Sequence, residues 1–116
     1  MQKIIKGKVG EAIAYSYLKK HRYKMVEKNF KTSAGEIDLI VTDKKYLVFV
    51  EVKMRSSLSM GYPREAVNNY KQNKIKLVAM QYLKLHSIIN VPVRFDVIEI
   101  VGDEHNYTIE HFVNAF

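Results

Sequence analysis

Hydrophobic residues follow two periodic patterns along the chain, one with the spacing of a helix and one with the spacing of strands. Val9, Ile13 and Tyr17 recur every four residues, which predicts a helix over residues 7–21. After residue 22, apolar side chains either alternate with polar ones or gather in short runs of valine, isoleucine and phenylalanine, as strands do. Three successive strands are therefore predicted, at residues 23–30, 36–42 and 46–54.

The rest of the chain contains a predicted loop, a second predicted helix and two predicted strands. A glycine and a proline mark a loop over residues 56–63, and that proline, Pro63, suits the first turn of a helix. An apolar stripe then predicts a long helix over residues 64–86. The stripe consists of Val67, Tyr70, Leu77, Val78 and Leu85. Two last strands are predicted at residues 93–100 and 107–112.

The predicted element order is α-β-β-β-α-β-β. It indicates an α/β fold with a mixed central sheet flanked by helices. The 116 residues fit a single domain spanning residues 1–116, and a hydrophobic fraction of 47% is enough to form a core. The apolar C-terminal segment IEHFVNAF offers an edge strand through which a homodimer could form.

Composition narrows the classes of protein to consider. The absence of cysteine excludes disulfides, thiolate metal sites and a cysteine nucleophile, and it favours a cytoplasmic location. No apolar run approaches the roughly 20 residues that span a bilayer, so no membrane association is expected. The formal net charge of +7 favours a polyanionic partner, most often a nucleic acid, over a merely well-solvated basic surface.

Two of the predicted core strands, at residues 36–42 and 46–54, contain charged residues. These are Glu36 and Asp38 in the first strand, and Glu51 and Lys53 in the second. Because side chains alternate along a strand, each of these strands has one wholly apolar face and one face with a charged end. A two-residue turn at Lys44-Lys45 would join them as a hairpin. Counting back from that turn sets Asp38 opposite Glu51, and Glu36 opposite Lys53.

Two interpretations of these facing carboxylates remain open. Like charges directly opposite each other are destabilising, and a bound divalent cation such as Mg²⁺ or Mn²⁺ would offset their repulsion with oxygen ligands. Alternatively, Glu36 and Lys53 form a surface salt-bridge ladder, while Asp38 and Glu51 are solvated. A pair of carboxylates acting as general acid and base is a third arrangement, which the adjacent lysine and the basic charge disfavour.

These residues carry a resemblance to a known group of proteins. Asp38, followed after the hairpin by Glu51-Val52-Lys53, looks like the D…(D/E)xK signature of the restriction-endonuclease-like, or PD-(D/E)XK, nuclease superfamily. The segments GKVGEAIAYSYLKKHRYK, NFKTSAGEIDLIVTD, LVFVEVKMRS, EAVNNYKQNKI and RFDVIEI resemble, in order, the small bacterial YraN-like family. This resemblance runs from about residue 7 to residue 116.

The resemblance implies a restriction-endonuclease-like fold related to the archaeal Holliday junction resolvases. It implies that Asp38 and Glu51 are metal ligands, that Lys53 is the catalytic lysine, and that Glu11 is the further acidic residue of the resolvase-like branch. The implied activity is Mg²⁺- or Mn²⁺-dependent hydrolysis of DNA phosphodiester bonds, in branched or single-stranded recombination or repair intermediates. The alternatives are a nucleic-acid-binding module that cleaves nothing and an interaction protein with a salt-bridge ladder.

Four further residues are expected to support the site. Lys71 and Lys74 fall within the apolar stripe of the second helix, so either their stems lie along the core edge or their ammonium groups reach phosphates. Arg55 flanks the site, and Glu36 is either a further ligand or the partner of Lys53. Asp96 has no catalytic role in this interpretation and is expected to hydrogen-bond a neighbour such as Arg94, and the four histidines are taken as structural.

Overall fold

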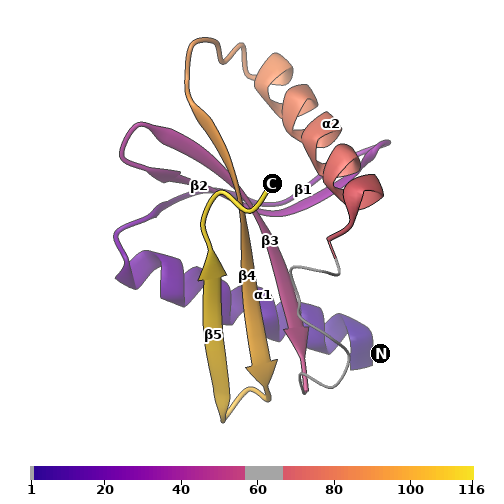
Figure 1. Ribbon diagram of the computed structural model, residues 1–116, viewed down its shortest axis with the longest axis vertical. Coiled ribbons are helices and arrows are strands. Elements are labelled where there is room, and N and C mark those ends of the chain that lie inside the picture. Colours follow the sequence, from indigo (N-terminus) through magenta and orange to yellow (C-terminus); the bar gives the residue numbers. More distant parts are fainter. Residues whose placement is uncertain (1, 57–66) are drawn as a thin grey trace.

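The computed structural model describes residues 2–56 and 67–116, with side chains from residue 7 onward (Figure 1). Seven elements follow the predicted order α-β-β-β-α-β-β, which is thereby confirmed. They are α1 (Gln2–Lys20), β1 (Lys24–Thr32), β2 (Gly35–Asp43), β3 (Tyr46–Arg55), α2 (Asn69–Leu85), β4 (Val93–Gly102) and β5 (Tyr107–Phe112).

The strands form one five-stranded mixed sheet in the order β1-β2-β3-β4-β5. β3 and β4 run parallel, from the pair Leu47–Val93 to the pair Arg55–Val101, and the other neighbours are antiparallel. The parallel pair needs a crossover connection, and α2 lies within it. β5 is an edge strand, as expected, and the homodimer predicted to form through it stays a prediction.

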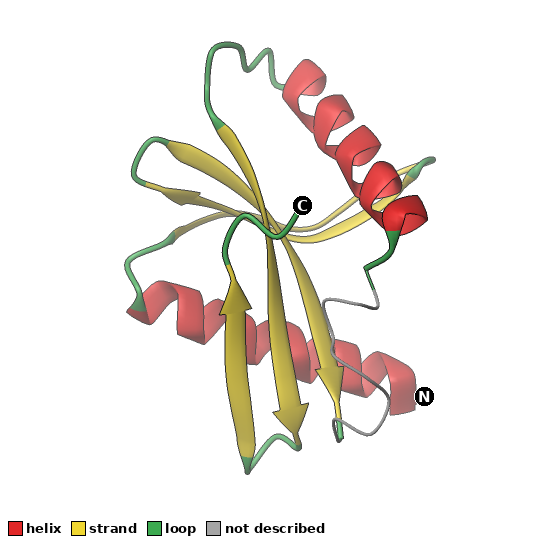
Figure 2. Ribbon diagram, viewed as in Figure 1, coloured by secondary structure: helices red, strands yellow, loops and turns green. Residues whose placement is uncertain are grey.

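Each helix covers one face of the sheet, so the core has two halves. Ala14 and Leu18 of α1 pack on the first face. They meet the apolar side chains Leu39, Val41, Val48, Val50, Ile98 and Ile100. The second face carries α2, whose buried residues are Ile75, Val78, Ala79 and Tyr82. Figure 2 shows the two helices crossing the sheet at different places, so that each leaves part of its face uncovered.

The sheet is strongly twisted, and the twist separates β2 from β3 at one end. In Figure 2 the far ends of β1 and β2 run across the view, whereas β4 and β5 run down it. The hairpin keeps the predicted register from the pair Asp43–Tyr46 to the pair Leu39–Val50, and the pairing stops there. The rest of β2 pairs with β1 alone, so the two strands of the hairpin form a fork that opens at Asp38.

The alternation of faces along β2 also breaks at the fork. Ile37 packs in the same core half as Ile40, on the α2 face, although strict alternation predicted that it would share a face with Leu39. Opposite this break in β1, Asn29 adopts a left-handed backbone with φ of 54°, a conformation that asparagine tolerates better than most residues. A local irregularity therefore replaces regular pleating where the acidic side chains lie.

The first residue of each helix differs from the prediction. α1 begins at Gln2 rather than at residue 7. α2 begins at Asn69, because Asn68 is its N-cap and accepts a hydrogen bond from the Lys71 backbone N–H at 3.0 Å. The predicted start at residue 64 and the loop over residues 57–63 lie outside the described residues. No helix in the described part of the chain is both long and apolar enough to cross a membrane.

The predicted apolar stripe of the second helix was correct at Val67 and Val78, which are buried, and wrong at three other positions. Tyr70, Leu77 and Leu85 are 69%, 49% and 68% exposed, so they face solvent rather than the core. The buried side of α2 consists of Ile75, Val78, Ala79 and Tyr82. The physical reason is that this helix carries apolar residues on both sides, so periodicity alone does not choose between two stripes.

A buried polar network lies on β4, away from the fork. Asp96 is fully buried and accepts two hydrogen bonds from the Arg94 guanidinium, each of 2.9 Å. It also lies 2.7 Å from His111 Nε2 and accepts a 2.9 Å hydrogen bond from the Asn114 backbone N–H. Arg94 extends the network to Asp43 at 3.0 Å. The predicted partnership of Asp96 with Arg94 is confirmed.

Candidate active site

Asp38 lies at the fork, where β2 leaves β3. Its Oδ2 atom accepts a 2.8 Å hydrogen bond from the backbone N–H of Val52. The side chain thereby takes the place of the backbone carbonyl that would have continued the sheet. Burial raises the pKa of Asp38 to about 8, and the neighbouring Glu51 carboxylate adds to that rise.

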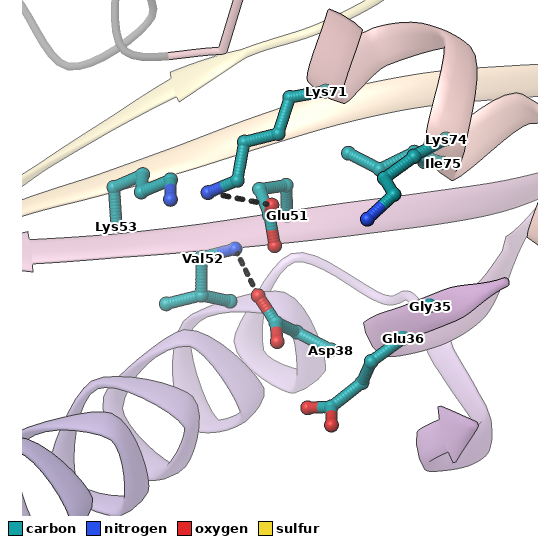
Figure 3. Close-up of a pocket in the computed structure, with 9 residues that line it drawn as sticks. All are labelled: Gly35, Glu36, Asp38, Glu51, Val52, Lys53, Lys71, Lys74 and Ile75. Atoms are coloured by element: carbon teal, nitrogen blue, oxygen red, sulfur yellow. Dashed lines mark hydrogen bonds and ion pairs between the residues drawn. The ribbon is translucent and has the colours of Figure 1, made fainter. Parts of the chain in front are cut away.

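Glu51 and Lys53 project from β3 toward the face that α2 covers. Lys71 of α2 approaches from the other side, with its Nζ atom 3.8 Å from Glu51 Oε2. Burial lowers the pKa of Lys53, and the neighbouring Lys71 ammonium lowers it further. Figure 3 shows the carboxylate of Glu51 between these two lysines and Asp38. The predicted cluster of two carboxylates and a lysine is therefore brought together.

A cavity of about 360 Å³ opens beside this cluster. The residues that line it come from β2, β3 and α2 (Figure 3). They are Gly35, Glu36, Asp38, Glu51, Val52, Lys53, Lys71, Lys74 and Ile75. Because one side of the cavity is acidic and the other carries three lysines, it can hold a cation and an anionic group next to each other.

A second cavity of about 240 Å³ lies on the other side of the same residues, against α1. Gly7, Gly10 and Glu11 line it from the helix. Asp38, Val52 and Lys53 line both cavities. The fork is thus open on both faces of the sheet, and Asp38 can be reached from either one.

Glu11 completes an acidic group around Asp38. One oxygen from each of Glu11, Glu36 and Asp38 lies within 4.8 Å of the others, whereas Glu51 is not a member of that group. Burial raises the pKa of Glu11, and the charge of Asp38 raises it further. The set of oxygen donors is the kind that Mg²⁺ and Mn²⁺ prefer.

The surroundings of Asp38 fit a bound cation rather than a salt bridge. Among the residues that the structure describes, no lysine or arginine lies within 4.0 Å of the Asp38 carboxylate. Its close neighbours are carboxylates instead, and burial together with the neighbouring Glu51 raises the pKa of Asp38. A divalent ion at this point would replace the proton and neutralise the repulsion.

Two residues that position Glu11 were not found from the sequence. A Cβ added to Gly10 would lie 3.2 Å from the Cβ atom of Met54, so glycine allows α1 to approach β3 closely. Asn29, at the irregular point of β1, lies close enough to the Glu11 side chain to favour its charged form and so to lower its pKa. Gly10 gave a signal in the sequence, because a glycine inside a helix often has a packing reason. Asn29 gave none.

The remaining predicted residues divide into two groups. Lys71 and Lys74 line the larger cavity, which is the placement that phosphate binding requires. Glu36 does not face Lys53, as the extended register predicted, because β2 has already left β3; it pairs with Lys31 of β1 at 3.5 Å. Arg55 lines neither cavity and lies 3.8 Å from Glu99 of β4.

Comparison with known proteins identifies the family to which the chain belongs. The model described as "Uncharacterised protein family UPF0102" matches residues 10–100. A UPF0102 protein of Caldanaerobacter subterraneus subsp. tengcongensis is 47% identical over 113 residues, covering 95% of this chain and 93% of that protein. One of Thermodesulfovibrio yellowstonii is 45% identical over 116 residues, covering 100% of this chain and 99% of that protein. The YraN-like resemblance is confirmed at this level: the chain belongs to the UPF0102 family.

Proposed function

We propose that this protein is a metal-dependent endonuclease that hydrolyses phosphodiester bonds of DNA. One observation carries the proposal: the Asp38 carboxylate lies at the fork beside Glu51, and burial together with Glu51 raises its pKa to about 8, although Lys53 and Lys71 lie in the same cavity. A carboxylate pair held in this way is prepared for a cation that the lysines do not replace. The basic net charge of +7 supports a nucleic acid as the substrate.

The fold is compatible with the nuclease superfamily that the sequence resembles. The element order α-β-β-β-α-β-β and the hairpin that carries Asp38 and Glu51-Val52-Lys53 are those expected of a restriction-endonuclease-like domain. We include in the proposal the relation to Holliday junction resolvases, and hence branched or single-stranded DNA intermediates as substrates. Fold analogy supports this proposal, and the residues of the site are its main support.

The acidic residues would hold the metal. Asp38 lies next to Glu51 on one side and next to Glu11 and Glu36 on the other, so Asp38 would be the central ligand, with Glu11 and Glu36 close enough to share its ion and Glu51 as a further ligand beside it. A bound Mg²⁺ or Mn²⁺ would lower the pKa of an attacking water and offset the charge that builds on the phosphate. The Val52 backbone N–H keeps the Asp38 carboxylate fixed in the fork, so the ligand position is set before metal binds.

The lysines would act on the phosphate. Lys53 is partly buried beside both carboxylates, where its ammonium can stabilise negative charge on the phosphate oxygens in the transition state. Lys71 holds Glu51 in place through their 3.8 Å ion pair and faces the same cavity. Lys74, further along the helix, is placed to bind the backbone next to the scissile bond.

The test is cleavage of labelled single-stranded, flapped and four-way-junction DNA in the presence of Mg²⁺ or Mn²⁺. Asp38→Asn and Glu51→Gln remove charge without changing shape, and we expect each to lower the cleavage rate by about 100-fold or more. Glu110→Gln is the matched control, because Glu110 is an exposed carboxylate of β5 that lines neither cavity.

Three outcomes are informative. Cleavage that is lost in both site variants and retained in the Glu110→Gln control supports the proposal. Cleavage that survives in both variants contradicts it, because the activity then comes from elsewhere or from a contaminant. DNA binding without cleavage under either metal would leave a non-catalytic nucleic-acid-binding module on the same fold.

A further inference from the structure

An exposed aromatic ring lies next to the lysines of the larger cavity. Tyr70, in the first turn of α2, is 69% exposed, compared with 40% for Tyr107, the other tyrosine among the exposed large hydrophobic residues described. Exposing a ring of this size to water forgoes the stabilisation that its burial would give. The position therefore calls for a reason other than packing within this chain.

Lys74 connects this ring to the cavity. Its Nζ atom lies 5.2 Å from the centroid of the Tyr70 ring, one helical turn away, and the same side chain lines the cavity. Lys71 follows Tyr70 directly and lines the cavity as well. The ring therefore borders a positively charged wall of the candidate site, and most of its surface is still free to meet a ligand.

We propose that Tyr70 stacks on an unpaired nucleobase while Lys71 and Lys74 hold the phosphate of the same strand at the cavity. This inference rests on the proposed function and names the substrate class: a nucleic acid that presents unpaired bases. An aromatic side chain next to a cationic groove is the arrangement by which proteins bind single strands, because every base has a face on which to stack. Paired bases inside a duplex are already stacked on each other, so they leave no face for the ring.

A protein partner is the competing use of this surface. Leu77 is 49% exposed and lies about two helical turns after Tyr70, hence on the same side of α2. A hydrophobic partner would cover both residues. A single strand held at the cavity requires the ring and the lysines and does not require the leucine. Charge complementarity between the lysines and phosphate favours the nucleic acid.

The test compares four affinities in a chelating buffer, where cleavage cannot interfere. Wild type and Tyr70→Ala are each titrated with an oligothymidylate of about 12 nucleotides, within the usual site size of single-strand binders, and with an abasic oligomer of the same length. We expect Tyr70→Ala to weaken binding of the oligothymidylate by roughly 5-fold or more. Binding of the abasic oligomer should change little, because it offers no base to stack.

Three control variants sharpen the comparison. Tyr70→Phe keeps the ring and should bind as wild type does. Tyr107→Ala removes an exposed tyrosine that does not line the cavity, and Leu77→Ala removes the exposed leucine of the same helix; both should leave the affinity unchanged. Lys74→Gln should lower the slope of log affinity against log salt by about 1, as expected for one lost phosphate contact.

The outcomes separate this inference from the proposed function. Equal loss of affinity for both oligomers, or no loss at all in Tyr70→Ala, would overturn stacking while leaving the nuclease proposal intact. A loss in Leu77→Ala as large as that in Tyr70→Ala would point to an apolar contact and would also overturn it. If wild type binds no nucleic acid, single- or double-stranded, the proposed function fails together with the inference.

Discussion

Two aspartates on neighbouring parts of the sheet have opposite surroundings. Asp96 of β4 is surrounded by donors: the Arg94 guanidinium, His111 and the Asn114 backbone N–H. Asp38 of β2 receives a single backbone hydrogen bond and lies among carboxylates. Although burial opposes it, hydrogen bonds from His111 and Arg94 lower the pKa of Asp96, whereas burial and Glu51 raise the pKa of Asp38 to about 8.

The difference supports the proposal that Asp96 is a structural carboxylate and that Asp38 binds a ligand. Both carboxylate oxygens of Asp96 have donors from the same chain, so the network stabilises the native state without a bound ligand. Asp38 is left with unfavourable repulsion that the chain itself does not remove. Such an imbalance at a cavity is characteristic of functional sites, where stability is given up for binding.

Among the changes in stability, the largest is expected from Asp96→Asn. The change leaves Arg94 buried with only Asp43 as its anionic partner, so we expect the free energy of unfolding to fall by about 3 kcal/mol. Urea denaturation measures it. The control is Asp103→Asn, in the exposed turn before β5, where we expect a much smaller loss, because water replaces the two backbone hydrogen bonds that Asp103 accepts. Similar losses in the two variants would mean that the Asp96 network is not a structural centre.

Asp38→Asn, measured in chelating buffer, is expected to raise the free energy of unfolding at alkaline pH, by less than Asp96→Asn lowers it. Because the native pKa of Asp38 is about 8 and the ordinary value is 3.8, the native state binds the extra proton between these limits. The contribution of Asp38 to stability is therefore greatest in acid and falls as pH rises from about 4 to about 8. Asparagine does not titrate and can still accept the Val52 hydrogen bond.

We therefore expect Asp38→Asn to unfold at higher denaturant than wild type at pH 8, by on the order of 1 kcal/mol, and the advantage to vanish near pH 5. For Asp96 the sign is reversed: its lowered pKa gives stability that is present above pH 3.8 and is lost in stronger acid. A variant with Asp38→Asn that is less stable than wild type at pH 8 would show that Asp38 is a structural residue like Asp96.

Sequence patterns predicted the parts of the site that depend on local geometry. The element order and the hairpin register near the turn follow from alternation and from a two-residue connection, so Asp38, Glu51 and Lys53 could be brought together in advance. The fork could not be predicted, because it results from the twist of the whole sheet. For that reason the pairing of Glu36 with Lys53 was wrong.

Long-range packing also limited what could be predicted on the α1 side. α1 can approach β3 closely because Gly10 has no Cβ to meet Met54, and Glu11 has Asn29 of β1 beside it. Neither contact leaves a periodic signal in the sequence. Three members of the predicted stripe of the second helix, Tyr70, Leu77 and Leu85, are exposed, because this helix carries apolar residues on both sides and periodicity does not say which of them meet the sheet.

The smallest effect is expected from a pair of glycine variants on α1. Gly10→Ala pushes the added methyl against Met54, so the helix must shift by a few tenths of an ångström and carry Glu11 with it. We expect metal affinity to fall by about 10-fold, in the range found for groups that orient ligands. Gly7→Ala is the control for the contact with Met54: Gly7 lines the same cavity, but nothing lies within 4 Å of its added Cβ, so the helix need not shift.

Both variants replace glycine by alanine in one helix, so both gain similar helix propensity, up to about 1 kcal/mol. Calorimetric titration with Mn²⁺ measures the affinity of each. Equal affinities in Gly7→Ala and Gly10→Ala would indicate that Glu11 does not contribute to the metal site, and that the ligands are Asp38 and Glu51 without it.

Proton release on metal binding tests most directly whether Asp38 is prepared for a cation. Mn²⁺ is titrated into the protein at pH 7 in buffers with different ionisation enthalpies, for wild type and Asp38→Asn. Because Asp38 holds its proton up to about pH 8, metal binding to wild type should release roughly one proton, and Asp38→Asn should bind more weakly and release almost none. Equal affinity and equal proton release in the two proteins, or no binding to wild type, would contradict a metal site at Asp38.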